Sequence, residues 1–256
     1  MWADMQQPER WFWLLSTLAT VVLLARLWNF GLLPTYRFFA SYLLFDVIRS
    51  AFVFSSTTIY AWMWVTTEPL LWLLYIVVVL ELYSLVFKNY PGIATMGRWA
   101  VMGTLSLSFI VALLTLLVDV RASQEYPILQ GIFVIDRVVC TSLMLFLILI
   151  NVFLLSFPVT LTRNVVSYCI GYFVYFAGKM ASLFFQNLHG TQVIRIVSTI
   201  VLLISVGCLA YWVLFLSRRG EQLAVRLGAR AKPEDEERIL VTLNTINNTL
   251  LRTARK

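Results

Sequence analysis

Hydrophobic residues fall in long runs along most of this chain, and short polar stretches separate the runs. A helix needs about 20 residues to cross a hydrocarbon core of about 30 Å, and the runs reach that length. The pattern therefore predicts seven membrane-spanning helices. Their expected limits are residues 10–31, 35–58, 69–87, 98–120, 128–157, 164–188 and 191–217.

The prolines mark the limits of these predicted helices. Proline has no N–H to donate, so it is best tolerated in the first turn of a helix or outside it. Each of the seven prolines falls at or between the ends of predicted segments: Pro8, Pro34, Pro69, Pro91, Pro127, Pro158 and Pro233. We therefore expect no spanning helix to contain a proline near its centre.

The chain changes character after the last predicted span. Residues 218–232 are strongly basic and are expected to attach to anionic lipid headgroups. Residues 234–237 are all acidic, which suits the first turn of a helix, and apolar residues then recur at helical spacing. The sequence predicts a cytoplasmic amphipathic helix that binds a second copy or another membrane protein, with packing beneath the bundle as the alternative. The residues expected to make this contact are Ile239, Leu243, Ile246 and Leu250.

Composition excludes a soluble fold and gives the membrane bundle an orientation. The chain is 60% hydrophobic and 13% charged, with a mean hydropathy of +0.82. Nine of the 20 Lys and Arg residues follow residue 217, so the net charge of +7 belongs largely to the tail and does not indicate nucleic-acid binding. Basic residues between the spans collect on the side of this tail, which predicts an outside N-terminus and a cytoplasmic C-terminus.

Several ionisable residues fall inside the predicted spans, where each unpaired charge costs about 2.5–3.5 kcal/mol. At 1.5 Å per residue, Arg49, Asp136 and Lys179 are expected about 13 Å below the outer boundary, and Asp46 and Glu81 about 18 Å below it. The equal depth of Asp136 and Lys179 predicts an ion pair between their helices. Asp46 and Arg49 are three residues apart, so they share a helix face and can pair locally.

Other charges within the predicted spans have less definite partners. Arg137 points away from Asp136 and is available to Glu81 or to another polar group. Arg195 can reach the outer interface or the same polar region. Asp46 and Glu81, at one depth, could instead share a proton. The set indicates either structural ion pairs or a polar cavity in the outer half that binds a small molecule, with a slight preference for an anion, or a proton.

The chain lacks the residue patterns of common catalytic sites. His189 is the only histidine, and we find no phosphate-binding glycine loop, nucleophile elbow or zinc-protease motif. Cys140, Cys169 and Cys208 all fall within predicted spans, where they are expected to be packing residues. We therefore expect no enzymatic activity, no metal and no cofactor.

Two segments carry a resemblance to known sequences. The run Glu81-Leu-Tyr-Ser-Leu-Val-Phe-Lys-Asn-Tyr-Pro-Gly-Ile and the final run from Leu243 to Lys256 resemble a group of uncharacterised seven-helix membrane proteins from soil bacteria. The resemblance implies a multi-pass protein of the bacterial inner membrane. It implies no activity.

Together these features predict an all-α membrane protein with two parts. Residues 1–217 form a seven-helix bundle in the lipid bilayer, and residues 218–256 form the basic segment and the amphipathic helix. The expected function is that of a receptor or sensor with a polar cavity in its outer half and the cytoplasmic helix as output. A scaffold subunit of a membrane complex and a transporter or proton-conducting protein are the alternatives.

Overall fold

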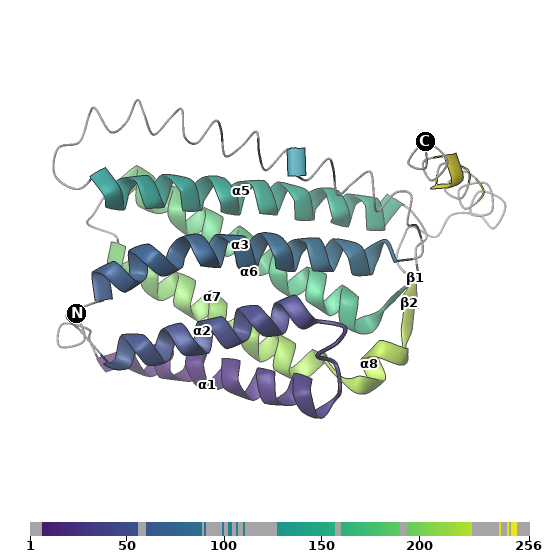
Figure 1. The fold of residues 1–256 in the computed structure, drawn as a ribbon, viewed down its shortest axis with the longest axis horizontal. Coiled ribbons are helices and arrows are strands. Elements are labelled where there is room, and N and C mark those ends of the chain that lie inside the picture. The colour runs from purple at the N-terminus through teal and green to yellow at the C-terminus, as the bar shows by residue number, and fades with distance from the viewer. Residues whose placement is uncertain are drawn as a thin grey trace.

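The chain folds into long helices that lie side by side (Figure 1). A computed structural model describes residues 7–55, 60–88, 90, 127–156, 160–189 and 194–226, with isolated residues between 99 and 110 and between 241 and 249. The long helices are α1 (Gln7–Asn29), α2 (Arg37–Ser55), α3 (Tyr60–Val86), α5 (Pro127–Ser156), α6 (Arg163–His189) and α7 (Ile194–Phe215).

These six helices overlap six of the seven predicted segments, so the helical class of the fold is confirmed. Most of the fourth predicted segment, 98–120, lies outside the described residues. Among the described residues, three helical stretches are long and apolar enough to cross a membrane: Trp11–Asn29, Val65–Val86 and Ile196–Phe215. A shorter apolar stretch, Val138–Leu154, lies in α5. These features are those of a membrane protein.

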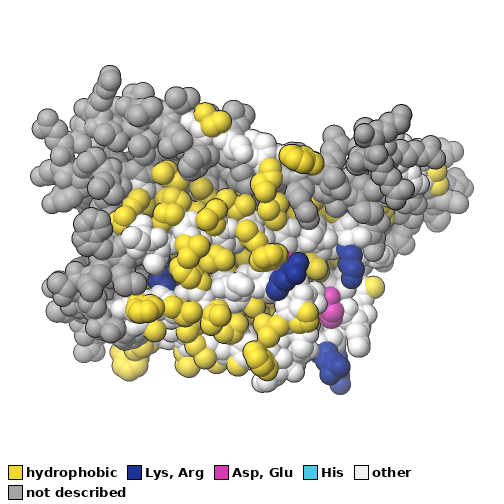
Figure 2. Space-filling model, in the orientation of Figure 1, with side chains coloured by type: hydrophobic (Ala, Val, Ile, Leu, Met, Phe, Trp, Pro, Cys, Tyr) yellow, Lys and Arg dark blue, Asp and Glu magenta, His cyan; other side chains and the backbone are white. Residues whose placement is uncertain are grey.

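The surface of the bundle also suits a lipid environment. Hydrophobic side chains cover most of the described surface in Figure 2, and Lys and Arg side chains lie mainly near one end. Leu214 is 71% exposed and Leu149 is 66% exposed. Exposed patches of this extent would be costly in water.

One end of the bundle carries additional structure that the sequence did not predict. The short helix α8 (Arg218–Gln222) follows α7, and strand β2 (Ala224–Arg226) then pairs antiparallel with β1 (Thr160–Thr162), the strand before α6. We call this the α8 end. Figure 1 shows that the turn between α1 and α2 and the last turns of α3 and α7 lie there too. Residues 218–226 thus form ordered structure on the bundle, in addition to contributing basic side chains.

The turn after α1 is formed by a glycine. Gly31 has a φ of +66°, the left-handed conformation that glycine adopts without a steric penalty. Its N–H bonds the carbonyl of Trp28, and the N–H of Leu32 bonds the carbonyl of Leu27, as in a Schellman motif. The chain therefore leaves α1 in a defined direction and enters α2 after Tyr36.

The expectation that Pro69 marks the start of a helix is wrong. Helix α3 begins at Tyr60, nine residues before the predicted start, and Pro69 lies inside it. A proline removes one backbone hydrogen bond, and a membrane helix tolerates that loss when neighbouring groups satisfy the freed carbonyl. This earlier start shifts the position of every α3 residue relative to the bundle ends.

The core between α2, α6 and α7 is unusually aromatic. Tyr36, Phe39, Tyr168, Tyr172 and Phe176 are among the largest fully buried side chains. Helices α6 and α7 are in close contact at Gly171, where an added Cβ would collide with the ring of Trp212. A small residue at this contact allows the two backbones to come together.

Candidate functional site

The predicted ion pair between α5 and α6 is present. Lys179 Nζ lies 2.8 Å from Asp136 Oδ1, and the two side chains are 12% and 8% exposed. Lys179 is 10 residues from the end of α6, and Asp136 is nine residues from the start of α5, so both lie about 14 Å from the end of the bundle opposite α8. The pair therefore joins the two helices well inside the bundle.

The Asp136 carboxylate also receives donors from α3 and from its own helix. The indole Nε1 of Trp72 donates to Oδ1 at 3.0 Å, and the thiol of Cys140 does so at 3.6 Å. Three donors thus converge on one oxygen. Cys140 contributes a hydrogen bond as well as packing, and Trp72 brings α3 into the same group.

A second ion pair joins α2 and α3, and it corrects the expected partner of Arg49. Arg49 Nη2 lies 2.8 Å from Glu68 Oε2, with side chains 16% and 8% exposed. The sequence placed Glu68 in a loop and paired Arg49 with Asp46. Because α3 starts at Tyr60, Glu68 lies inside the helix and faces α2. Asp46 is half-buried and forms no ion pair within the part of the chain that the structure describes.

Helix α3 links the two ion pairs. Glu68 and Trp72 are four residues apart, so they lie on one face of the helix, and they contact Arg49 and Asp136 respectively. We call Arg49, Glu68, Trp72, Asp136 and Lys179 the charged cluster. It connects α2, α3, α5 and α6 at one level of the bundle.

Glu81 lies near the α8 end, away from the charged cluster. It is 21 residues after the start of α3, about 31 Å along the axis, so the expected depth of about 18 Å is wrong. Its carboxylate accepts the backbone N–H groups of Phe38 at 2.9 Å and Phe39 at 3.1 Å, and the hydroxyl of Tyr168 at 3.4 Å. Glu81 thus caps the N-terminus of α2 from another helix.

This position also overturns two expected partners of Glu81. Asp46 lies in the middle of α2, and Arg137 follows Asp136 in the half of α5 that is far from α8. Asp46 is not at the level of Glu81, so the two carboxylates do not share a proton, and the α5 backbone at position 137 lies at a different level of the bundle from Glu81. The side chains of Arg137 and Arg195 lie outside the described set, as do Ile239, Leu243, Ile246 and Leu250.

A network of polar side chains fastens the segment after α7 to the bundle. The amide of Asn164, at the start of α6, donates to the carbonyl of Ser217 at 2.9 Å and accepts the N–H of Ser217 at 3.2 Å. The same amide nitrogen donates to Glu221 Oε2 at 3.1 Å, and the Tyr36 hydroxyl donates to that oxygen at 3.0 Å. We call Tyr36, Asn164, Ser217 and Glu221 the C-terminal clamp.

Two further features support the C-terminal clamp. The side chain of Ser217 caps α8 by accepting the N–H of Gly220 at 3.0 Å. Gly220 lies so close to Asn164 that an added Cβ would collide with the side-chain oxygen of the amide. The Tyr36 hydroxyl is the donor to the Glu221 carboxylate, so the turn between α1 and α2 is joined to the same network.

Sequence reasoning missed Glu68, Trp72, Tyr36, Asn164 and Glu221. Their partners lie 19 to 185 residues away in the sequence, so no local spacing indicates them. The usable signal was the helical spacing of Glu68 and Trp72, once α3 is extended across Pro69. Among the described residues, no group of three or more His, Cys, Asp or Glu side chains is arranged to hold a metal.

Comparison of this chain with protein-family models, with curated proteins and with solved structures finds no match in any of the three. The charged cluster, the C-terminal clamp and the helices that join them are the features of the described chain that bear on its function.

Proposed function

We propose that this is a seven-span protein of the bacterial cytoplasmic membrane, with an outside N-terminus and a cytoplasmic C-terminus, that acts as a receptor or sensor. The observation that carries this proposal is the charged cluster, in which two buried ion pairs connect four helices. The signal is a proton or a small charged molecule that changes the charge balance of this cluster.

The energetics of buried charges favour a switch at this position. Each charge in the apolar part of a membrane costs about 2.5–3.5 kcal/mol, and its partner offsets that cost. Neutralising Asp136 would leave Lys179 without a counter-ion and would weaken the hydrogen bond that Asp136 accepts from Trp72. The preferred positions of α3, α5 and α6 then change together, which a purely apolar core would not do.

Helix α6 provides the connection to the output. Lys179 lies in the charged cluster, and Asn164, on the same helix, holds the start of α8. A shift or rotation of α6 therefore acts directly on residues 216–226. Through this segment it acts on the C-terminal tail, which we propose binds a second copy or another membrane protein.

The distribution of exposed basic residues supports the proposed orientation. Arg37, Lys88, Arg163, Arg218 and Arg219 are exposed at the α8 end. Basic residues are retained on the cytoplasmic side of bacterial membrane proteins. Labelling with a membrane-impermeant maleimide tests this orientation, with single cysteines at residues 57 and 256 after replacement of the three native cysteines. We expect labelling of residue 57 in intact cells and of residue 256 only after lysis, and accessibility of both sites from one side would refute the topology.

The sensor proposal is tested by the hydrogen-exchange protection factors of residues 216–226 in lipid nanodiscs between pH 5 and pH 8, since these factors remove the intrinsic pH dependence of amide exchange. We expect the protection factors to fall several-fold at one end of this range in the wild-type protein and to be independent of pH in the Asp136→Asn/Lys179→Met variant. Ser142→Ala, at a buried position of α5 outside the charged cluster, is the matched control and should behave as wild type. If the protection factors of residues 216–226 do not depend on pH in the wild type, or change equally in the double variant, the scaffold alternative is favoured.

A further inference from the structure

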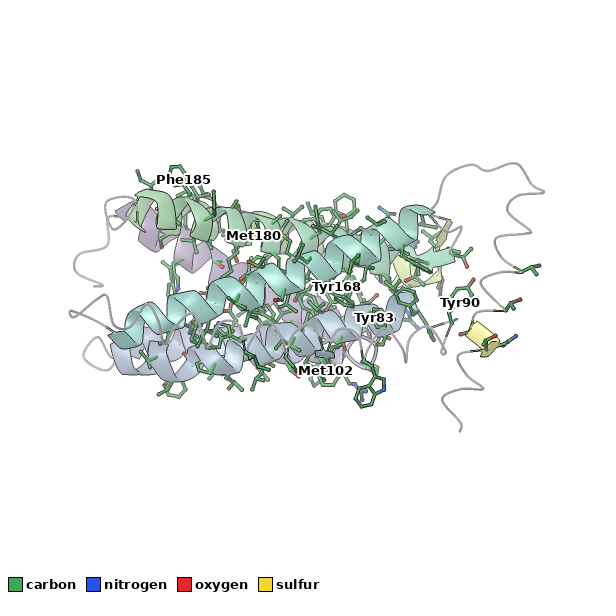
Figure 3. The ribbon with its side chains drawn as sticks, turned by 90° about the horizontal axis from the view of Figure 1, so that it is seen from above. Tyr83, Tyr90, Met102, Tyr168, Met180 and Phe185 are labelled. Atoms are coloured by element: carbon green, nitrogen blue, oxygen red, sulfur yellow. The ribbon has the colours of Figure 1, made fainter. Side chains whose placement is uncertain are left out.

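One face of α6 carries a column of tyrosines between the charged cluster and the α8 end. Tyr168, Tyr172, Tyr175 and Lys179 are spaced by four, three and four residues, so they lie along one side of the helix. They span about 16 Å of the axis. Tyr168 and Tyr172 are fully buried, and Figure 3 shows Tyr168 among the side chains that fill the interior.

The column meets the charged cluster at Lys179, which belongs to both. Lys179 Nζ lies 5.0 Å from the ring centroid of Tyr75 on α3, and the hydroxyls of Tyr75 and Tyr175 are 2.8 Å apart. The lysine that pairs with Asp136 therefore contacts the ring of Tyr75, whose hydroxyl is hydrogen-bonded to Tyr175 of the column.

The column ends near two carboxylates at the α8 end. The Tyr168 hydroxyl donates to Glu81 Oε2 at 3.4 Å. The ring of Tyr168 packs edge to face on Tyr36 at 5.3 Å, and the Tyr36 hydroxyl donates to Glu221. Glu81 is thus the acceptor that is hydrogen-bonded to the column, and Glu221 lies beyond Tyr36, whose contact with Tyr168 is between the two rings.

Tyr172 lies between these two hydrogen-bonded ends. Its ring centroid is 5.0 Å from that of Tyr168 and 6.5 Å from that of Tyr175, and its buried hydroxyl has no hydrogen-bond partner among the described residues. Phenylalanine would bury the same ring without the cost of a desolvated hydroxyl. Packing alone would therefore favour phenylalanine at position 172, and the buried hydroxyl of Tyr172 indicates a further role.

We propose that this column is a proton-transfer route from the charged cluster to Glu81. It rests on the proposed function, because it makes the proton the charged species that the cluster handles. Each tyrosine passes its hydroxyl proton to the next acceptor and receives one from the preceding donor, so every tyrosine ends neutral. The Lys179 ammonium group loses one proton and the Glu81 carboxylate gains one. A proton from the water on the side opposite α8 then protonates the Asp136 carboxylate, which passes it to Lys179 and so restores the ion pair. One water molecule beside the Tyr172 hydroxyl completes the route.

Other polar groups face the two ends of the route. Trp72 and Tyr75 from α3 and Cys140 from α5 surround the Asp136–Lys179 pair, with Glu68 and Arg49 beyond. Around Glu81 are the first N–H groups of α2, the hydroxyl of Tyr168 and the charge of Arg37. The route therefore starts in a region of paired charges and ends at a carboxylate held by donors.

Proton flux into liposomes tests the route. The full-length protein is reconstituted in vesicles that contain a pH-sensitive dye, and a potassium gradient with valinomycin imposes a membrane potential. We expect dye acidification well above that of protein-free vesicles, and at least tenfold slower acidification with Tyr172→Phe or Tyr168→Phe. Tyr83→Phe is the matched control, since this buried tyrosine of α3 packs against Phe87 and Phe146 away from the column, and it should retain the wild-type flux.

Glu81→Gln provides a second variant that retains an acceptor oxygen for α2 and cannot take up a proton to complete the route. The proton flux of this variant should also be at least tenfold lower than that of the wild type, while the protein remains monodisperse. Flux equal to that of empty vesicles, or flux unchanged by the tyrosine and Glu81 substitutions, would overturn the route. These outcomes are separate from the sensor test: a pH response of residues 216–226 without flux removes the route alone, and flux without that response removes the sensor.

Discussion

The carboxylate of Glu81 on α3 accepts the backbone N–H of Phe39 at 3.1 Å, in the first turn of α2. The first N–H groups of a helix have no partner within it, and in an apolar environment an unsatisfied group is costly. A side chain 42 residues away in the sequence supplies that partner here. The start of α2 is therefore stable only when α3 is in place beside it.

Replacing Glu81 with leucine should loosen the first turn of α2. The change removes the acceptors of Phe38 and Phe39, and the loss of a helix cap costs about 0.5–2 kcal/mol. Hydrogen exchange at these two amides should accelerate several-fold, while the middle of α2 is unchanged. Ser84→Ala, which removes only a hydroxyl bonded to the Glu81 carbonyl, should leave both amides as slow as in the wild type. Equal rates in the Glu81 variant would show that another group caps α2.

Removing one member of the Asp136–Lys179 pair should destabilise the protein more than removing both. Lys179→Met leaves a buried carboxylate without its cation, and breaking a buried pair in this way costs about 3–5 kcal/mol. The Asp136→Asn/Lys179→Met variant removes that charge and should recover most of the loss. Thermal unfolding in detergent gives the comparison, and a double variant less stable than Lys179→Met would show that the pair does not act as a unit.

Gly220→Ala should detach the C-terminal clamp without unfolding the bundle. The added methyl group would collide with the Asn164 side chain, which holds Ser217 and Glu221. We expect faster proteolysis after residue 216 and an unchanged unfolding temperature of the helices. Gly207→Ala, on the exposed side of α7 with nothing within 4 Å of the new Cβ, should be neutral. Protease resistance equal in the two variants would mean that the clamp tolerates the displacement.

Gly171→Ala should weaken the contact between α6 and α7. Its new Cβ would collide with the Trp212 ring, and overpacking of this kind costs about 1–3 kcal/mol. Thermal unfolding should therefore occur at a lower temperature than in the wild type or in Gly207→Ala. Adding Trp212→Leu to Gly171→Ala creates space and should restore part of the stability. A further loss in the double variant would contradict this account.

Helices whose ends are marked by a change from apolar to polar residues could be predicted from the sequence. The apolar runs for α5 and α6 were predicted within one residue of their observed limits, at Pro127–Ser156 and Arg163–His189. Depth counting along these two helices therefore identified the Asp136–Lys179 pair correctly. Counting works when both helix ends are known, because the rise per residue is constant.

The same method failed on α3 because Pro69 was taken as its start. The error placed Glu68 in a loop and moved Glu81 toward the middle of the membrane, so the partners of both were wrong. The C-terminal clamp could not be predicted for a different reason. Strands of three residues and a helix of five have no measurable periodicity, and their stability comes from contacts with Asn164 and Tyr36 that only the folded chain creates.

The pairing of β1 with β2 also has a consequence for biosynthesis. Leu161 pairs with Val225, so the two strands enclose α6 and α7 within one loop of the chain. During translation β1 emerges first and has no partner until both helices have been made and β2 follows them. The strand pair is therefore the last of these contacts to form, and its presence distinguishes a chain whose α6 and α7 have been completed from one still being inserted.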